Sequence, residues 1–303
     1  MTPLRQRMLD AMALRGLAAR TMEAYIHAVI GLSRHYRCSP EVLTARQVQD
    51  YMLHLHRERK LSFSTVNQAA SAFKFLYGTV LGLDLRQFDV PFARVPQQVP
   101  EMLSRQEVAL LLACAPHVTA GTFLRLAYAT GLRLNELCHL RWRDVHDAPD
   151  RMCIHVRQGK GGKGRLVPLT PDTLAVLQQW RALQPRAAHG DDVPDWVFTA
   201  RADRCKPMHD QSPQRWYRAA ANAAGITKHG GLHTLRHCYA THLLESGVDV
   251  YSLQQWLGHN HVDTTARYLH LVRPDAAVGA RGVSLALLQA LPALELLPLS
   301  EPA

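Results

Sequence analysis

The chain carries His-Thr-Leu-Arg-His at residues 233–237, and this stretch is the starting point for interpreting the rest. His233 and Arg236 are three residues apart, so both side chains project from one face at the start of a predicted helix. Two other segments share this chemistry: Ala-Thr-Gly-Leu-Arg-Leu-Asn-Glu-Leu at 129–137, and Leu-Gly-His at 257–259, followed nine residues later by Tyr268. Together the three segments supply two arginines, two histidines and a tyrosine that could converge on one ligand.

The two arginines, Arg133 and Arg236, indicate a phosphate ligand. A guanidinium donates two parallel hydrogen bonds and stays charged, which suits a phosphodiester that gains negative charge in its transition state. A free tyrosine has a pKa near ~10, so deprotonation at pH 7 costs roughly 4 kcal/mol. The two cations, with a neutral His233 as general base, could lower that cost for Tyr268. Attack on phosphorus would then join the enzyme covalently to DNA.

The deoxyribose hydroxyl that leaves needs a proton donor, and a flexible lysine suits that role. We assign it to Lys160, in the Gly-rich segment Gln-Gly-Lys-Gly-Gly-Lys-Gly, although the spacing leaves Lys163 as an open alternative. We expect His259 to donate a further hydrogen bond to a nonbridging phosphate oxygen. None of these residues requires a metal or a cofactor.

Each of these residues also has a structural interpretation. Arg133 could simply pair with Glu136, and a lone tyrosine is more often a half-buried core residue. His233 and His237, four residues apart, could bind zinc, but no third ligand follows at a typical spacing. The combination therefore carries the functional interpretation, and no single residue does.

The composition favours a nucleic acid partner and a reducing compartment. The 303 residues include 35 lysines and arginines against 25 acidic residues, a net charge of +10, which suits a surface dense in phosphates. The six cysteines are scattered without a CxxC pair. No run approaches the roughly 20 apolar residues that span a bilayer. We expect a soluble, cytoplasmic protein with no membrane partner.

The first part of the chain predicts a bundle of four helices. Thr21, Thr44 and Ser62 stand where N-caps are wanted, and Gly16, Pro40 and Gly82 where helices should end. A proline-containing linker follows. Apolar residues recur at helical spacing over residues 4–14, 25–36, 48–55 and 66–81.

The second part predicts a mainly α domain with a small β-sheet, so the fold class is α+β. Ser104 with Glu107 forms a predicted capping box. Two short strands, residues 152–157 and 165–169, should form a hairpin with the lysines at its tip. Helices are expected from Ser104 to about residue 112 and over residues 123–130, 171–183, 212–224, 234–245, 250–257 and 262–268.

In order and spacing, Arg133, Lys160, the His233-x-x-Arg236 motif, Leu-Gly-His259 and Tyr268 resemble the tyrosine recombinase family of the phage-integrase type, near its integron-integrase and Xer-like branches. The resemblance implies these six residues as the catalytic set, with Tyr268 as nucleophile, a 3′-phosphotyrosine intermediate, and rejoining without ATP. It also implies a two-domain clamp around double-stranded DNA and a tetramer on two recombination sites. The boundaries are then a SAM-like core-binding domain over 1–88, a linker over 89–102 and a catalytic domain over 103–303.

Family members exchange a C-terminal helix between protomers, which offers a burial place for the leucine-rich stretch at residues 283–297. We favour DNA integration or transposition of a mobile element as the biological role, with Xer-like resolution of chromosome or plasmid dimers as the alternative. A DNA-binding architectural protein without chemistry is the rival from another class. A metal-dependent nuclease would need clustered carboxylates, and the motifs lack them.

Overall fold

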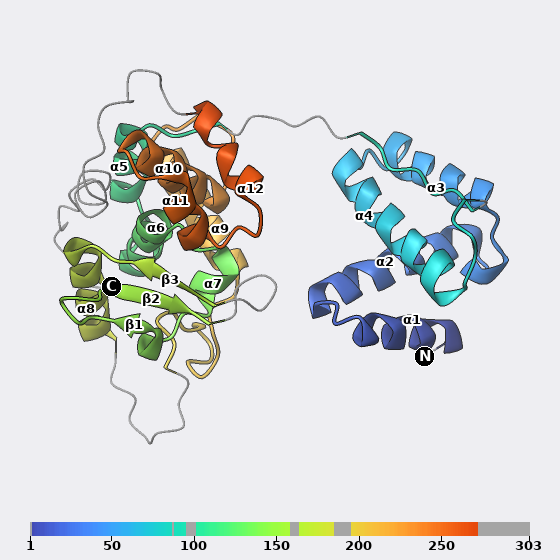
Figure 1. Cartoon of the computed structure of the whole chain (residues 1–303), viewed down its shortest axis with the longest axis horizontal. Coiled ribbons are helices and arrows are strands. Elements are labelled where there is room, and N and C mark those ends of the chain that lie inside the picture. Colours follow the sequence, from blue (N-terminus) through green and yellow to red (C-terminus); the bar gives the residue numbers. More distant parts are fainter. Residues whose placement is uncertain (1, 87, 95–100, 158–163, 185–194, 272–303) are drawn as a thin grey trace. The chain divides into compact units, whose positions relative to one another are not determined.

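The protein divides into two compact units, Met1–Gln98 and Val99–Ala303, each with its own hydrophobic core. The fold is mainly helical with one small antiparallel sheet, as the sequence predicted (Figure 1). The structure is a computed structural model, and it describes residues 2–86, 88–94, 101–157, 164–184 and 195–271.

The first unit is a helical bundle whose core is closed by Met12, Leu32, Phe73 and Leu76, all without solvent exposure. The fourth predicted helix changes character along its length, because its last six residues form a π-helical turn before Gly82 reverses the chain at φ +71°. The elements are α1 (Pro3–Leu14), α2 (Ala19–Tyr36), the 3₁₀ turn η1 (Pro40–Val42), α3 (Ala45–Arg57), α4 (Phe63–Lys74) and the π turn η2 (Phe75–Val80).

Two of the three predicted N-caps in this unit are confirmed. The Thr44 hydroxyl accepts from the amide of Gln47, whose side chain returns a bond to the Thr44 amide, and Ser62 accepts from the amide of Thr65. The prediction for Thr21 is wrong: α2 begins at Ala19, and its N-cap is Ala18, three residues before Thr21. The helix begins without a side-chain cap, so the cap pattern could not mark its start.

The beginning of the proline-containing segment packs on the first unit. Val90 is buried, and the side chain of Asn67 on α4 exchanges two hydrogen bonds with the backbone of Ala93, both at 2.8 Å. Lys74 also lies over the ring of Phe92, 4.3 Å from its centre. Through these contacts, Phe92 and Ala93 lie against α4, several residues after the last helical turn of the first unit.

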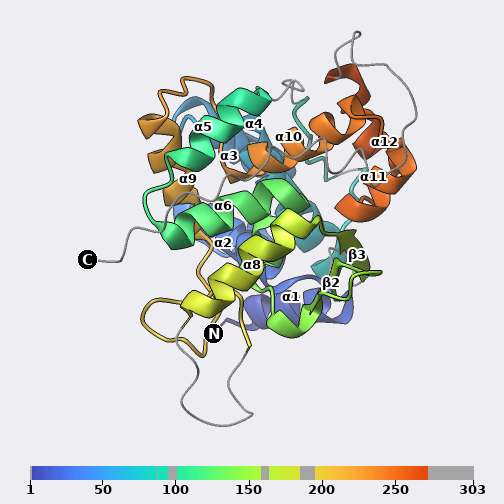
Figure 2. The ribbon, with the colours of Figure 1, turned by 90° about the vertical axis from the view of Figure 1, so that its left-hand side faces the viewer.

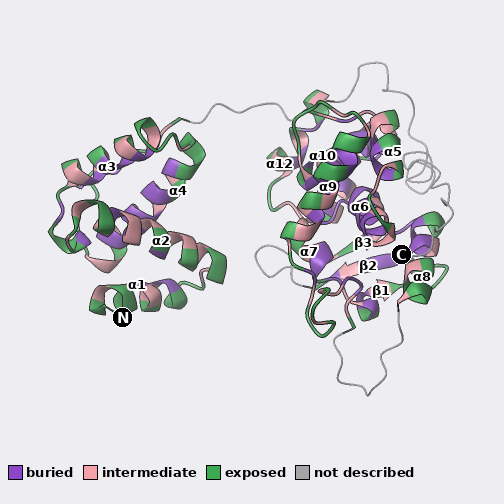
Figure 3. Cartoon of the chain, turned by 180° about the vertical axis from the view of Figure 1, so that it is seen from behind, coloured by how far each residue is buried: buried purple, intermediate pink, exposed green. Residues whose placement is uncertain are grey.

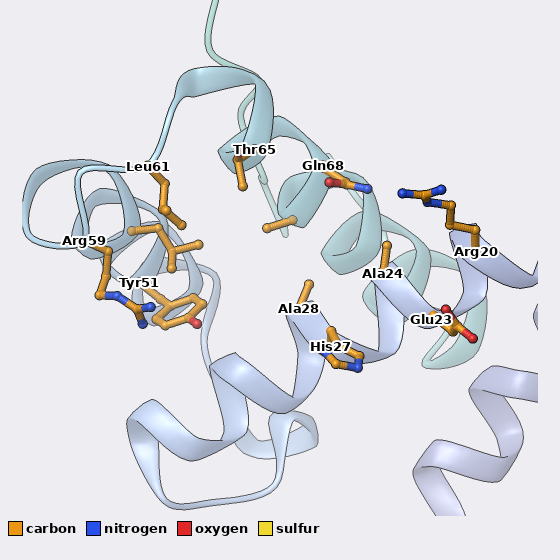
Figure 4. Close-up of a pocket in the computed structure, with 12 residues that line it drawn as sticks. Arg20, Glu23, Ala24, His27, Ala28, Tyr51, Arg59, Leu61, Thr65 and Gln68 are labelled. Carbon is orange, nitrogen blue, oxygen red and sulfur yellow. The ribbon is translucent and has the colours of Figure 1, made fainter. Parts of the chain in front are cut away.

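A groove crosses the first unit between α2, α3 and α4 (Figure 4). Its floor includes small and apolar side chains such as Ala28 and Leu61, and its polar side chains include Arg20, His27 and Gln68. The lining includes Arg20 and Arg59 against one acidic residue, Glu23, so the groove offers hydrogen-bond donors and a net positive charge.

In the second unit, strand β3 of the sheet packs against α11, and α8 packs against α6 (Figures 1 and 2). The strands run in the order β1-β2-β3, and all neighbours are antiparallel. The elements are α5 (Arg105–Ala113), α6 (Val118–Thr130), α7 (Leu134–Cys138), η3 (Trp142–Asp144), β1 (Val145–His146), β2 (Cys153–Val156), β3 (Arg165–Pro168), α8 (Pro171–Leu183), α9 (Gln211–Ala223), α10 (Leu232–Glu245), α11 (Val250–Leu257), α12 (Val262–Ala266) and η4 (Leu269–Leu271).

The predicted hairpin is present, with Cys153 opposite Pro168 and Val156 opposite Arg165. Its tip, which contains Lys160 and Lys163, lies outside the described residues, as does the leucine-rich stretch at 283–297. Strands β2 and β3 therefore flank, in the sequence, the segment that contains the lysines proposed as proton donor.

Helix α10 is the central helix of the second unit, and most of its residues are buried (Figure 3). It packs against α6, so the His233-x-x-Arg236 motif at its start lies beside the end of α6, where the segment of Arg133 begins. The capping box of Ser104 with Glu107 is confirmed at the start of α5. Among the described residues, no helix combines the length and apolar character that a membrane crossing requires.

Candidate active site

Arg133 is placed by a sharp change of chain direction between α6 and α7. Gly131 ends α6 at φ +58°, and a Cβ at this position would lie 2.4 Å from the Tyr239 ring. Only glycine fits here, because the left-handed conformation and the ring both exclude a side chain. Arg133 then caps α7, and its guanidinium donates to the backbone oxygen of Gly258 at 2.9 Å.

Glu136 connects Arg133 to a third arginine, Arg165 on β3. Its carboxylate accepts from Arg133 Nη1 at 2.9 Å and from both Nη atoms of Arg165, at 2.9 and 2.6 Å. Arg165 also donates from Nε to the Trp256 oxygen at 2.7 Å. Burial raises the pKa of Glu136, but the two guanidiniums outweigh it and hold that pKa at about 2. The carboxylate is therefore ionised and links α7 to β3, and the two arginines that it binds connect both to the end of α11.

Arg236 is the most deeply placed charged group of the site, with 3% of its surface exposed. It donates to the Gly131 oxygen at 2.5 Å, the Leu257 oxygen at 2.7 Å and His259 Nε2 at 3.1 Å. Burial, and then Arg133, lower its pKa to about 10, so it remains charged at neutral pH. The fixed guanidinium joins the ends of α6 and α11.

His259 follows Gly258, which ends α11 at φ +63°. Because arginine only donates, His259 Nε2 accepts from Arg236, and the Nδ1 hydrogen then points to the Thr265 hydroxyl at 2.8 Å. Burial and the nearby arginines lower the pKa of His259 to about 4. In this arrangement Nε2 is an acceptor, so the predicted donation to a phosphate oxygen requires that this nitrogen gains a proton.

Tyr268 lies just beyond α12, which ends at Ala266, so the prediction of a helix reaching residue 268 is wrong. The tyrosine occupies a turn, with its amide bonded to the Thr265 oxygen. Its hydroxyl shares a 2.8 Å hydrogen bond with His237 Nδ1, and its ring stacks on His259 at 6.4 Å between centres. Burial raises the pKa of Tyr268, and Arg236, Arg267 and Arg133 partly offset that rise.

His233 occupies the first turn of α10, at the helix start where the sequence placed it, and it is exposed. Partial loss of water around its ring, then Arg236 and Arg133, lower its pKa, so it is neutral at pH 7. The preceding loop is held in place: the Leu232 amide donates to the Gln214 side chain, and the Gly231 amide donates to Thr234.

The structure thus brings five of the six predicted residues to one location. Arg133, Arg236, His259 and Tyr268 are linked by the contacts above, and His233 joins them through its ring contact with His237, which bonds Tyr268. Lys160 and its alternative Lys163 lie outside the described residues. Within the described part of the chain, no group of three or more histidine, cysteine or acidic side chains is arranged to hold a metal ion.

Three residues of the site were missed from the sequence: Glu136, Arg165 and His237. Glu136 was interpreted only as a structural partner of Arg133, and His237 only as half of a zinc pair. His237 had one usable signal, since it follows His233 by one turn and shares its helix face. Arg165 had none, because its partners, Glu136 and the Trp256 oxygen, are distant in sequence.

Comparison with known proteins identifies the family of this chain. Residues 101–273 match the phage integrase family, and residues 4–87 match the phage integrase N-terminal SAM-like domain. The chain belongs to the phage integrase family. Phage integrases of this family are tyrosine-type site-specific recombinases.

Relatives of this integrase cover most of its length. A putative integrase/recombinase, y4qK, of Sinorhizobium fredii is 34% identical over 274 residues, covering 89% of this chain and 85% of that protein. Tyrosine recombinase XerC of Xanthomonas campestris is 32% identical over 271 residues, covering 85% and 80%. Both agree with the family resemblance drawn from the motifs.

Solved structures of integrases support the fold. The XerA recombinase is 27% identical, with a TM-score of 0.51, and the match covers 90% of this chain and 94% of that one. A lambda integrase dimer bound to a COC′ core site has a TM-score of 0.68 at 19% identity, covering 92% and 78%. The second likeness concerns the fold alone.

Proposed function

We propose that this integrase cleaves and rejoins double-stranded DNA through a 3′-phosphotyrosine at Tyr268, without ATP or a metal ion. The observation that carries the proposal is that Arg133, Arg236, His259 and Tyr268, from three separate segments, lie together around the buried Arg236 guanidinium and the partly buried Arg133 guanidinium, both held by backbone oxygens. A phosphodiester in this place would meet cations whose positions are already set, so little reorganisation is needed as charge develops.

The proposed roles of the residues are those that the family resemblance implies. Arg133 and Arg236 bind the scissile phosphate, and His233 and His259 add contacts to it. Tyr268 attacks phosphorus and displaces the 5′ oxygen, which takes a proton from Lys160 or Lys163. The phosphotyrosine bond keeps the energy of the broken phosphodiester, so a 5′-hydroxyl from another strand can reseal the DNA.

The DNA partner and the assembly are part of the same proposal. Integrases with this fold have been solved bound to a core site and as a tetramer bound to a Holliday junction. We infer that the units 1–88 and 103–303, joined by the linker 89–102, form a clamp around duplex DNA. Four protomers would then assemble on two recombination sites, and the protein would act in the cytoplasm. The net charge of +10 and the donors of the α2–α4 groove support this partner.

We further propose that the C-terminal tail is exchanged between protomers on DNA. Deleting the chain from Ser284 onward should abolish cooperative assembly in a gel-shift titration while the monomer keeps its helical circular dichroism. Full assembly by the truncated protein would refute the exchange.

The biological role that we propose is integration or transposition of a mobile element. The likeness to XerC, at 32% identity over most of both chains, favours dimer resolution as the second candidate. The two roles differ in their DNA sites. Cleavage of sequences flanking the gene, without cleavage of the chromosomal dimer-resolution site, supports the first role, and the reverse supports the second.

A nicked suicide substrate tests the chemistry. Because the short 5′ fragment diffuses away, the covalent intermediate accumulates and is seen as a shifted band on a denaturing gel. We expect an adduct from the natural protein and none from Tyr268→Phe. Tyr251→Phe is the matched control, since Tyr251 lies on α11 with 67% of its surface exposed. A natural protein that binds the site without forming an adduct would instead be the architectural protein.

A further inference from the structure

The hydroxyl of Tyr268 is held by His237, a histidine outside the six residues to which the sequence assigned catalytic roles. Tyr268 Oη and His237 Nδ1 are 2.8 Å apart, and Tyr268 is 7% exposed, so little water competes for this bond. The His237 ring also lies against the His233 ring, with 5.2 Å between centres and an angle of 89°. His237 therefore contacts the nucleophile on one side and His233 on the other.

We propose that His237 accepts the Tyr268 proton when the phenol attacks phosphorus, an inference that rests on the function proposed above. The proton moves from Oη to Nδ1, the Oη–P bond forms, and the bond from phosphorus to the 5′ oxygen breaks, with the lysine protonating that oxygen. In rejoining, the incoming 5′-hydroxyl returns its proton to the lysine, and the departing Tyr268 oxygen recovers its proton from His237.

The protonation state of His237 suits this role. Burial, then His233, Arg236 and Arg267, lower its pKa to about 4, so at neutral pH the ring carries no charge. In the tautomer with its hydrogen on Nε2, Nδ1 accepts the hydrogen bond from the Tyr268 hydroxyl. A phosphodiester bound by the arginines adds negative charge to the same surroundings and raises the pKa of His237 toward the working pH. A base is most effective when its pKa is near that pH.

His233 and His237 lie at different depths in α10, and their proposed roles differ accordingly. His233 is exposed in the first turn of α10, and His237 is one turn further into the helix and only partly exposed. The hydrogen bond to the nucleophile comes from the inner residue. In this proposal His237 takes the role of general base that the sequence suggested for His233, and His233 is left to contact the DNA phosphate.

Single-turnover cleavage of the nicked substrate between pH 5.5 and 9 tests this division. The variants are His237→Asn, His237→Ala and the matched control His233→Asn. An asparagine oxygen can stand near the place of Nδ1 and keep the hydrogen bond, but it cannot take the proton. Both His237 variants should cleave about 100-fold or more slowly, and both should lose the fall in rate at acid pH. His233→Asn should be slower but keep that fall.

Added imidazole should restore cleavage to His237→Ala and not to a His233→Ala variant. Thermal unfolding and affinity for an uncleavable site establish that each variant is folded and binds DNA. A His237→Asn variant with the natural rate and pH profile would overturn the proposal. The proposal would also be overturned if the loss of cleavage rate at acid pH disappeared in His233→Asn and persisted in the His237 variants. Absence of an adduct from the natural protein would count against the proposed function itself.

Discussion

At the scale of single residues, the carboxylate of Glu136 is the group on which the positions of two arginines depend. It is 7% exposed and lies between Arg133 and Arg165, which is equally buried. Removing one member of a buried ionic group costs more than the group contributes, because the remaining charges lose their partner.

We therefore predict that Glu136→Gln lowers the free energy of unfolding of the second unit by about 3 kcal/mol at pH 7. The pKa of Glu136 in the folded protein, about 2, lies below its ordinary value of 4.5. Its contribution is thus complete above pH 4.5 and is lost as the pH falls toward 2. Urea unfolding followed by tryptophan fluorescence measures it, because all five tryptophans lie in residues 142–256.

The difference between the natural protein and Glu136→Gln should shrink as the pH falls from 5 to 3, since a protonated glutamate resembles glutamine. A difference that stays constant over this range would mean that folding does not lower the pKa of Glu136. Asp263→Asn, an exposed change on α12, controls for nonspecific effects of removing a carboxylate.

The sequence predicted five site residues that the structure brings together. This was possible because arginine, histidine and tyrosine are chemically distinctive side chains, and their order and spacing can be recognised within short segments of the sequence. The residues that connect them could not be predicted in the same way. Arg165 takes its role from Glu136, 29 residues away, and from a backbone oxygen 91 residues away. Such contacts exist only after the chain has folded.

At the scale of elements, prediction depended on length. Pro171–Leu183 and Val250–Leu257 were predicted with their observed bounds, since each has a clear start signal and an apolar face. Helix α7 and strand β1 were missed, because five and two residues are too short to show a period. Helix α6 begins earlier than predicted because a histidine, His117, caps it, and histidine is not a usual cap.

The end of α11 determines where His259 lies, so we predict that Gly258→Ala damages both stability and cleavage. Gly258 has φ +63°, and an added Cβ would lie 2.8 Å from Arg165 Cδ. The left-handed strain and the overlap together should cost about 2–4 kcal/mol, and displacement of the His259 loop should slow cleavage. Urea unfolding and the suicide-substrate assay measure the two effects.

Gly225→Ala is the matched control for this change. Gly225 has φ +67°, but an added Cβ meets nothing within 4 Å, so only the backbone strain of about 1–2 kcal/mol applies. Cleavage should keep its natural rate once the protein is folded. Equal losses of stability in the two variants would show that the contact with Arg165 has no energetic weight.

At the scale of the whole molecule, two separate cores predict two separable unfolding transitions. Ser104→Ala, which removes the cap of α5, should lower the unfolding free energy of the second unit by about 1 kcal/mol. Thr44→Ala, which removes the cap of α3, should do the same to the first unit, which contains no tryptophan. Tryptophan fluorescence should therefore detect only the first change, and helical circular dichroism should detect both. A shift of the fluorescence transition by Thr44→Ala would show that the units unfold together.

The claim that unites these scales is that the fold delivers Tyr268 to a phosphodiester as a nucleophile. Its most direct measurement is mass spectrometry of the covalent adduct after proteolysis and nuclease digestion. We predict a residual nucleotide on the peptide that contains Tyr268, linked through a 3′-phosphate. A nucleotide attached to any other residue, or an adduct that still forms with Tyr268→Phe, would contradict it.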